Sequence, residues 1–442
     1  MLRSFSVKNY KSFREENIFS LIKKAKHTDL SYSVFDNKLG KKNLSTLCSS
    51  VIYGPNAAGK TNIISAMDTF RSMVIRGNIH NSEQTISSNV AATSLELVPN
   101  IESKMEDENI FKIEFLFDNI LYNYELVLKL GGFLNTEFDR KIISEKLFIN
   151  NELLFDRGDD LTFGIAFKNK KISNKLNIDV MDEKIIKLLF SGLNNKDLFL
   201  THGFKALVSP ILASKFMEWI TDKFVVIYDA SSIKLLRKFE NPDNKTIYVE
   251  KTLEKAAKIF GVSGNNLGYT VDNDESAVLC SLIKSKDAVI PAKFFESYGT
   301  YRFINVFPLV LKALKEGSTL VIDEFDASLH PMALMNIINI FHNDDININH
   351  AQLIFDTHNP IFLNADLFRR DEIKLVERNS DNSSEIYTLA DFGTDKNGVR
   401  KGEDYMSNYF VNKYGAINEV DFSDLVEDII KGKIYEYEED DM

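Results

Sequence analysis

The sequence predicts an α/β fold, in which a mixed sheet with flanking helices carries an inserted β-hairpin and a helical lobe. Three observations support this prediction. A short apolar run, a glycine-rich turn and a helical pattern follow one another at residues 51–76. Two later apolar runs, at residues 319–322 and 353–355, are as short and continuous as strands buried on both faces of a sheet. Between these ends the apolar residues first alternate and later recur at helical spacing.

The N-terminal residues alternate as a strand does, with odd and even positions from residue 2 to residue 9 on opposite faces. Residues 21–45 then contain six lysines, at positions 23, 24, 26, 38, 41 and 42. A solvated loop is the favoured interpretation, and a patch for a nucleic-acid backbone is the alternative.

The stretch VIYGPNAAGKT at residues 51–61 contains the phosphate-loop pattern of a glycine, four residues and Gly-Lys-Thr. Its glycines allow several backbone N–H groups to point at one phosphate, and the following helix adds its positive end. Lys60 can reach the β- and γ-phosphates of ATP, and the hydroxyl of Thr61 can bind Mg²⁺. A chance glycine loop is the alternative, but the strand and helix around the pattern argue against it. The predicted nucleotide-binding residues are Gly54, Pro55, Asn56, Ala57, Ala58, Gly59, Lys60, Thr61 and Asn62.

In the middle of the chain the spacing of the apolar residues changes from that of strands to that of helices. Residues 111–128 predict a β-hairpin that turns at Asp118-Asn119, and a second hairpin is expected at residues 146–155, turning at Asn150-Asn151. From about residue 183 the apolar spacing becomes helical, with helices expected at residues 205–222 and 249–260. Gln84, in a polar stretch, is a weak candidate for a residue that links Mg²⁺ to the helical lobe.

Two carboxylates end the apolar run TLVIDE at residues 319–324. We predict that Asp323 holds Mg²⁺ through water and that Glu324 polarises the attacking water. A strand that ends in an acidic turn is the simpler alternative, but the phosphate loop in the same chain disfavours it. His358 ends the next apolar run, AQLIFDTH, where an imidazole could donate to a γ-phosphate. An ordinary histidine with satisfied hydrogen bonds is the alternative, but the position of His358 after Asp323-Glu324 disfavours it.

The order of the segments GPNAAGKTN, ESYGTYR, LVIDEFDASLHP and FDTHNP resembles the ABC-type ATPases of the RecF, SMC and OLD group. It is most similar to the compact ATPases of prokaryotic anti-phage and abortive-infection operons, such as that of the PARIS system. The resemblance covers residues 1–70 and 290–415 and implies an ABC-type P-loop ATPase head. It also implies that Ser297 and Gly299 belong to a signature that contacts ATP held by another subunit. Residues 328–331 would form the D-loop.

Five regions follow from these patterns. Residues 1–76 and 290–415 would be the two parts of the ATPase head, 77–180 a β-rich insertion, 181–289 a helical insertion and 416–442 an acidic tail. Strands are also expected at residues 372–378 and 385–392. His342, His350 and His358 recur every eight residues, but a metal site is disfavoured because His358 belongs to the ATPase pattern.

The composition disfavours several classes of protein, namely globally basic nucleic-acid-binding, disulfide-rich and membrane-spanning proteins. Of the 442 residues, 44% are hydrophobic and 26% are charged, and the formal net charge is −11, so no global basic field favours nucleic acid. The two cysteines, Cys48 and Cys280, are too few for a disulfide framework and fit a reducing cytoplasm. The sequence contains no run of eighteen consecutive apolar residues, so it does not predict a membrane-spanning helix. The N-terminal residues also lack the apolar core of a signal peptide.

The function predicted from these patterns is an ATP-binding and ATP-hydrolysing switch with Mg²⁺ as cofactor. The resemblance implies that it forms a homodimer or a higher homo-oligomer through composite ATP sites, and that it acts as the sensor of a two-component anti-phage system that controls a separate nuclease or toxin effector. The alternative is a RecF-like repair ATPase with DNA as its partner. A self-contained nuclease is disfavoured, because no Toprim-like set of acidic residues follows the ATPase pattern.

Overall fold

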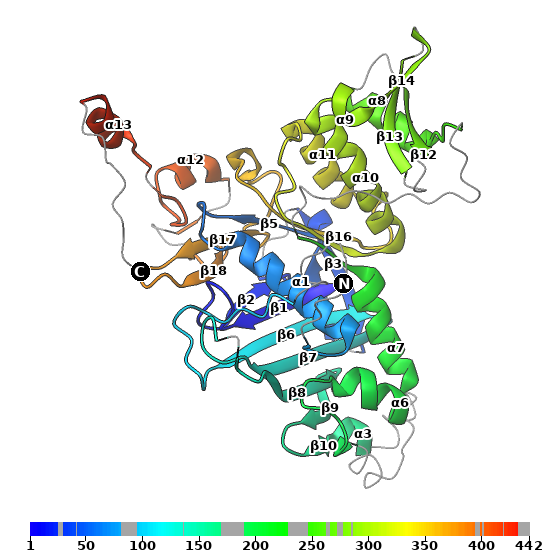
Figure 1. Ribbon diagram of the computed structural model, residues 1–442, viewed down its shortest axis with the longest axis vertical. Coiled ribbons are helices and arrows are strands. Elements are labelled where there is room, and N and C mark those ends of the chain that lie inside the picture. The colour runs from blue at the N-terminus through cyan, green and yellow to red at the C-terminus, as the bar shows by residue number, and fades with distance from the viewer. Residues whose placement is uncertain are drawn as a thin grey trace.

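The computed structural model of the chain is shown in Figure 1. It describes residues 1–24, 30–40, 42–80, 95–135, 137–168, 190–228, 246–261, 266–271, 277–283, 286–393, 398–399, 402–418 and 420–431. Gln84 lies outside these residues, as do residues 432–442 at the end of the acidic tail. Among the described helices, none is both long and apolar enough to cross a membrane.

A six-stranded sheet forms the centre of the fold. In spatial order its strands are β11 (Phe224–Ile227), β15 (Thr319–Ile322), β16 (Gln352–Asp356), β5 (Ser49–Tyr53), β17 (Ile373–Arg378) and β18 (Ser384–Thr388). All neighbours are parallel except β17 and β18. Ile52 belongs to one apolar core, whereas Val51 and Tyr53 belong to the other. The sheet is therefore buried on both faces, which explains why its strands are continuous apolar runs.

A second, antiparallel sheet of seven strands packs beneath the first. In spatial order its strands are β10 (Leu161–Phe163), β9 (Glu152–Arg157), β8 (Lys141–Ile149), β7 (Ile120–Lys129), β6 (Glu108–Phe117), β1 (Leu2–Lys8) and β2 (Asn17–Ser20). The expected hairpins are present: β6 and β7 turn at Asp118-Asn119, and β8 and β9 turn at Asn150-Asn151. All four turn residues have positive φ, as tight hairpin turns require.

These hairpins differ from the expected insertion in one respect. Strand β6 pairs with β1 along its length, from Leu2 opposite Phe115 to Lys8 opposite Ile110. The hairpins therefore extend a sheet that the N-terminal strand begins, and they do not form a lobe of their own. The local sequence does not reveal this pairing, because the two strands lie about a hundred residues apart in the chain. Backbone hydrogen bonds join β1 to β6, and no side-chain pattern indicates which strand pairs with β1.

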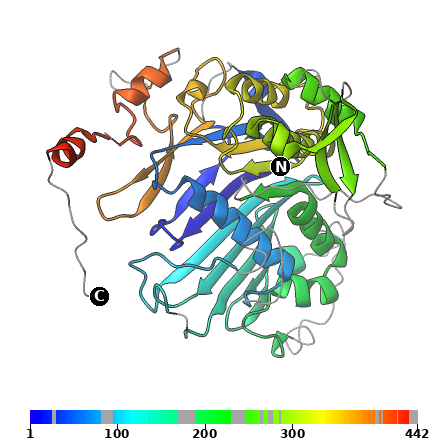
Figure 2. The same cartoon turned by 45° about the horizontal axis from the view of Figure 1, so that its top comes forward.

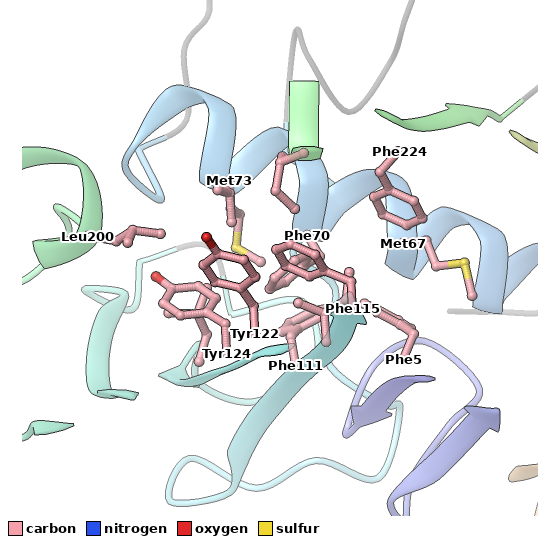
Figure 3. Packing of buried hydrophobic residues seen from close by; sticks show 14 of the residues in the cluster. Phe5, Met67, Phe70, Met73, Phe111, Phe115, Tyr122, Tyr124, Leu200 and Phe224 are labelled. Atoms are coloured by element: carbon pink, nitrogen blue, oxygen red, sulfur yellow. The ribbon is translucent and has the colours of Figure 1, made fainter. Parts of the chain in front are cut away.

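Helix α1 (Lys60–Arg76) lies between the two sheets. Figure 3 shows Met67, Phe70 and Met73 of this helix among the aromatic side chains of the antiparallel sheet. The ring of Phe70 lies 5.8 Å from that of Phe5 and 6.2 Å from that of Tyr124, both edge-on. The helix that follows the phosphate loop is thus fixed by a large aromatic core.

The region between residues 181 and 289 differs from a purely helical lobe. Helices α6 (Lys205–Leu207) and α7 (Pro210–Glu218), with a π-helical turn at Trp219–Lys223, pack on the antiparallel sheet, where Trp219 stacks on Phe115 at 3.8 Å. Strand β11 then joins the central sheet. After helix α8 (Lys251–Phe260), strands β12 (Asn266–Val271), β13 (Ala277–Ile283) and β14 (Ala288–Pro291) form a three-stranded sheet. The sequence predicts helices at residues 205–222 and 249–260 and does not predict these strands, although β12 and β13 have six and seven residues.

The remaining elements complete the head. The lysine-rich stretch near the N-terminus contains a β-hairpin of β3 and β4 where it was expected to be a loop. Helices α10 and α11 contribute to the core on the far face of the central sheet, and α12 and α13 follow β18. The bounds are β3 (Val34–Leu39), β4 (Lys42–Leu47), α3 (Ile165–Lys168), α9 (Ala292–Phe295), α10 (Tyr298–Glu316), α11 (Pro331–Phe341), α12 (Tyr405–Phe410) and α13 (Ser423–Ile430), with 3-10 turns at Ser31–Ser33 and Pro360–Phe362.

Candidate nucleotide-binding site

The phosphate loop connects β5 to α1 and needs its glycines for space. A Cβ on Gly54 would lie 2.3 Å from the carbonyl oxygen of Val376. A Cβ on Gly59 would lie 2.6 Å from Ser12 Oγ and 2.7 Å from Ser384 Oγ. Gly59 is also the N-cap of α1, with φ of +108°, and it has no side chain to accept from the first-turn N–H groups. The N–H of Asn62 donates to the carbonyl of Gly59 at 3.0 Å, which leaves the N–H groups of Lys60 and Thr61 available to an anion at the positive end of the helix.

Neighbouring side chains hold the loop in place. Ser384 Oγ donates to the carbonyl of Ala58 at 2.5 Å, and Arg378 donates to the carbonyl of Ala57 at 3.2 Å. Asn62 Nδ2 donates to Ser12 Oγ at 2.7 Å. Strand β18 and the turn after β1 thus support a loop conformation that the glycine pattern alone only permits.

Lys60 is buried within the loop that it follows. Its Nζ donates to the carbonyls of Gly54 at 2.9 Å and Pro55 at 3.1 Å. Burial lowers the pKa of Lys60, while the carboxylates of Asp356 and Asp323 oppose this shift. Charged phosphate oxygens accept stronger hydrogen bonds from an ammonium group than neutral carbonyls do. The ammonium group of Lys60 can therefore exchange the loop carbonyls for the oxygens of a phosphate.

Two buried aspartates lie at the carboxyl ends of neighbouring parallel strands, Asp323 after β15 and Asp356 at the end of β16. Burial, together with the charge of Asp356, raises the pKa of Asp323 to about 8, and a hydrogen bond from the Thr61 hydroxyl opposes the shift. Within the described residues, Asp323 Oδ1 and Asp356 Oδ2 have no hydrogen-bond partner. Buried carboxylate oxygens without donors beside a threonine hydroxyl are the oxygen ligands that Mg²⁺ prefers, so these residues fit the ion.

Glu324 has an exposed carboxylate on a fixed backbone. Its φ is +47°, a left-handed conformation that is unusual for glutamate. Its N–H donates to Asp356 Oδ1 at 2.5 Å, and its carbonyl accepts from the buried guanidinium of Arg302 on α10. The backbone is therefore held from two sides, while the carboxylate stays accessible to a water molecule.

A pocket of about 230 Å³ opens beside the phosphate loop, at the carboxyl ends of β5 and β16. His358 is exposed and lines this pocket together with Gly54 and Asn56. Thr357 precedes it and donates to Asp326 Oδ2 at 2.6 Å. The other lining residues are Tyr53, Pro55, Thr357, Tyr409, Ile417, Asn418 and Val420. The structure thus brings His358 to the phosphate loop, as a contact with a γ-phosphate requires.

Ser297 and Gly299 lie at the start of α10, outside this cluster. Ser297 is exposed, and it caps the helix by accepting from the N–H of Thr300 at 3.1 Å. A Cβ on Gly299 would lie 2.3 Å from the carbonyl oxygen of Ser328, so the start of α10 packs against the expected D-loop. Among the described hydrogen bonds, none joins Ser297 to the phosphate loop of its own chain.

Three contributors to the site could not be predicted from sequence motifs. Asp356 stands in the FDTHNP segment, but its importance depends on β15 and β16 being neighbours. Arg302 acts through the backbone of Glu324, and no spacing rule indicates that contact. Residues 417, 418 and 420 line the pocket from a segment with no motif of a nucleotide site.

The three histidines at eight-residue spacing contact different groups. His342 Nε2 lies 2.9 Å from Ser49 Oγ, and the ring of His350 stacks on Phe35 at 4.4 Å. His358 faces the pocket. The described structure therefore gives no support to a metal site shared by these histidines.

One family model and two solved structures are similar to this chain. Residues 49–364 match the family described as "AAA domain, putative AbiEii toxin, Type IV TA system". No curated protein sequence matches the chain. A solved structure described as the SMC head domain from Thermotoga maritima is similar at 13% identity and a TM-score of 0.37, covering 88% of this chain and 98% of that one. The SMC head bound to the C-winged helix domain of ScpA is similar at 12% identity and a TM-score of 0.35, covering 88% and 97%.

Proposed function

The chain belongs to the family described as "AAA domain, putative AbiEii toxin, Type IV TA system", and we propose that it is an ATP-hydrolysing switch of the ABC type. In this proposal it is the sensor of a two-component anti-phage system and controls a separate nuclease or toxin effector. ATP joins two copies of the chain, and hydrolysis releases them. The observation that carries the proposal is the convergence of Lys60, Asp323 and Glu324 at one end of the parallel sheet.

Each residue has a role that its position supports. Lys60 would leave the loop carbonyls and bind the β- and γ-phosphates of ATP. Thr61 and Asp323 would hold Mg²⁺, which lowers the negative charge of the phosphates when it is bound. The exposed carboxylate of Glu324 would accept a proton from the attacking water. His358 would donate to the γ-phosphate from the pocket wall.

The position of Ser297 supports a site shared between two chains. Its exposed side chain lies at the N-terminus of α10, where anions bind favourably. Because Ser297 makes no described hydrogen bond to its own phosphate loop, the signature is available to ATP on a second copy. ATP would then contact both chains and hold them together.

The first experiment measures assembly. In the Glu324→Gln variant, ATP should bind without rapid turnover, so sedimentation velocity should show a dimer with ATP and Mg²⁺ and a monomer without nucleotide. Addition of duplex DNA tests the RecF-like alternative. A Glu324→Gln variant that binds ATP but stays monomeric would contradict the shared site. ATP hydrolysis by the unmodified chain that requires DNA would favour a repair ATPase.

A further inference from the structure

A second cluster of buried polar side chains lies at the amino end of the central sheet, away from the phosphate loop. Cys48 directly precedes β5, Glu372 directly precedes β17, and His342 is the C-cap of α11. Strands β5 and β17 are parallel neighbours and lie side by side in both views (Figures 1 and 2), so Cys48 and Glu372 come together at their amino ends. None of the three residues is more than 4% exposed. The phosphate loop leaves the opposite end of β5, so this cluster is separate from the nucleotide pocket.

One potential ligand atom from each of these residues lies close to the other two. The Sγ of Cys48, a ring nitrogen of His342 and a carboxylate oxygen of Glu372 lie within 4.8 Å of one another. Ligand atoms around a tetrahedral Zn²⁺ ion lie about 3.3 to 3.6 Å apart, given bond lengths of about 2.0 to 2.3 Å. His342 Nε2 and Glu372 Oε1 are already 3.6 Å apart. The cluster therefore has to contract by at most about 1 Å to hold the ion.

Hydrogen bonds hold the histidine and the glutamate in place. Ser49 Oγ lies 2.9 Å from His342 Nε2 and donates to Glu372 Oε1 at 2.8 Å. The other carboxylate oxygen of Glu372 accepts from the N–H of Arg369 at 2.8 Å. Within the described structure, His342 Nδ1 is buried and has no hydrogen-bond partner. A buried imidazole nitrogen without a partner costs free energy, so the hydrogen bonds of the protein leave this ring able to bind a further ligand.

The types of ligand and their charges favour zinc. Thiolate, imidazole and carboxylate groups are all zinc ligands, whereas Mg²⁺ and Ca²⁺ prefer oxygen ligands alone. The charges of a Cys48 thiolate and the Glu372 carboxylate together balance a divalent cation, so the occupied site would be neutral. Burial and the charge of Glu372 raise the pKa of the Cys48 thiol, and zinc displaces the proton of a cysteine that it binds. Three protein ligands leave a fourth position, which a water molecule can take.

We propose that Cys48, His342 and Glu372 bind one Zn²⁺ ion. The ion joins the start of β5, the end of α11 and the start of β17, three segments that are far apart in the chain. Of the three histidines at eight-residue spacing, only His342 takes part. Because β5 leads directly into the phosphate loop, the ion stabilises the strand on which that loop is built. The inference goes beyond the proposed function and does not depend on it, since the ion binds without nucleotide.

The first experiment measures metal binding by the full chain without nucleotide. Mass spectrometry of the metal content should find one equivalent of Zn²⁺ after dialysis, and Co²⁺ in its place should give the near-ultraviolet absorption of a cobalt–thiolate bond. Cys48→Ser should remove this absorption and weaken zinc binding about 100-fold or more, because even the loss of an outer-shell partner costs about 10- to 100-fold. The matched control is Cys280→Ser, since Cys280 is also buried but lies on β13, outside the cluster. This variant should keep both the absorption and the affinity.

A second measurement needs no change at a cysteine. A ligand that binds only the folded state stabilises it, so Zn²⁺ should raise the melting temperature of the unmodified chain and EDTA should reverse the rise. Glu372→Gln should reduce this rise, because it removes one ligand charge. Asp323→Asn should keep the cobalt–thiolate absorption, which separates this site from the carboxylates beside the phosphate loop.

Three results would overturn the proposal. Zinc bound with unchanged affinity in Cys48→Ser would place the ion elsewhere, as would loss of the cobalt–thiolate absorption in Cys280→Ser alone. A chain that binds no zinc and gives no such absorption would leave the cluster as a buried ion pair of His342 and Glu372, bridged by Ser49. If Cys48→Ser does not fold, the melting temperature and the cobalt absorption of the unmodified chain still decide.

Discussion

At the scale of single residues, Glu324 is the most direct test of hydrolysis. Its backbone is held by Asp356 and Arg302, so the carboxylate can be changed without moving the strand end. Glu324→Gln should keep ATP binding and slow turnover by about 10² to 10⁴-fold, the usual contribution of a general base. Single-turnover hydrolysis and calorimetry measure the two quantities separately.

The control for this substitution is Glu385→Gln on β18, where the carboxylate is exposed and outside the pocket lining. This variant should hydrolyse ATP at the rate of the unmodified chain. Equal rates in the Glu324→Gln variant and the unmodified chain would remove Glu324 from the catalytic role.

The buried carboxyl of Asp323 predicts a pH dependence of stability without metal. Its pKa is about 8 in the folded chain, compared with an ordinary value of 3.8, so the folded state binds more protons between these values. Its contribution to the free energy of unfolding is therefore complete below about pH 3.8 and is lost as the pH rises towards 8. Asp323→Asn should flatten this decline in urea unfolding with EDTA between pH 5 and 8.5. A decline as steep as that of the unmodified chain would contradict the shift.

The phosphate loop and the Asp323-Glu324 pair are predictable because their chemistry depends on close spacing along the chain. Asp356 is different, since it becomes part of the site only when β16 lies beside β15. The left-handed backbone of Glu324 is also invisible to sequence patterns. The roles of the site residues stay predictions until the variants are measured.

At the scale of elements, Arg302 connects helix α10 to Glu324, just after the end of β15. Its buried guanidinium donates to the carbonyl of Glu324. We expect Arg302→Gln to lower kcat by about 10 to 100-fold with little change in KM, because small misplacements of a catalytic group cost up to ~10²-fold. Arg302→Lys should restore part of kcat, since lysine can still donate to the carbonyl.

A matched control lies at the other end of α10. Lys223 Nζ donates to the carbonyl of Glu316 at 2.9 Å, so Lys223→Gln also removes a side-chain contact with a carbonyl of this helix region, but far from Glu324. Steady-state kinetics should show no loss of kcat for this variant. An equal loss in both variants would indicate a general effect on α10 and not the positioning of Glu324.

Elements with local signals were predictable, and elements that depend on distant pairing were not. The two hairpins follow from Asp-Asn and Asn-Asn turns between alternating strands, which are local features. Strand β11 has four residues and depends on pairing with β15, almost a hundred residues away. The placement of β6 beside β1 is equally non-local. Such contacts explain why the middle region does not form the separate lobes that its periodicity suggested.

At the scale of the whole molecule, the shared site predicts that two defective chains complement each other. The choice of signature variant depends on the structure. Any side chain at Gly299 would meet the carbonyl of Ser328 at 2.3 Å, so a substitution there would disturb the packing of α10. Ser297 is exposed and acts as an N-cap, a position that serine, aspartate and asparagine occupy about equally well. Ser297→Asp therefore adds charge and keeps the cap, and Ser297→Asn is its neutral control.

Lys60→Ala should bind ATP poorly but keep an intact signature, whereas Ser297→Asp should keep an intact phosphate loop and repel the γ-phosphate of its neighbour. Each variant alone should be nearly inactive. In a mixed dimer, one of the two composite sites pairs an intact loop with an intact signature, so co-expressed chains should recover up to about half of the ATPase activity per dimer. Ser297→Asn should lose less activity than Ser297→Asp, because only the charge differs. Purified mixed dimers without any recovery would show that the signature does not act across the interface, and that hydrolysis is completed within one chain.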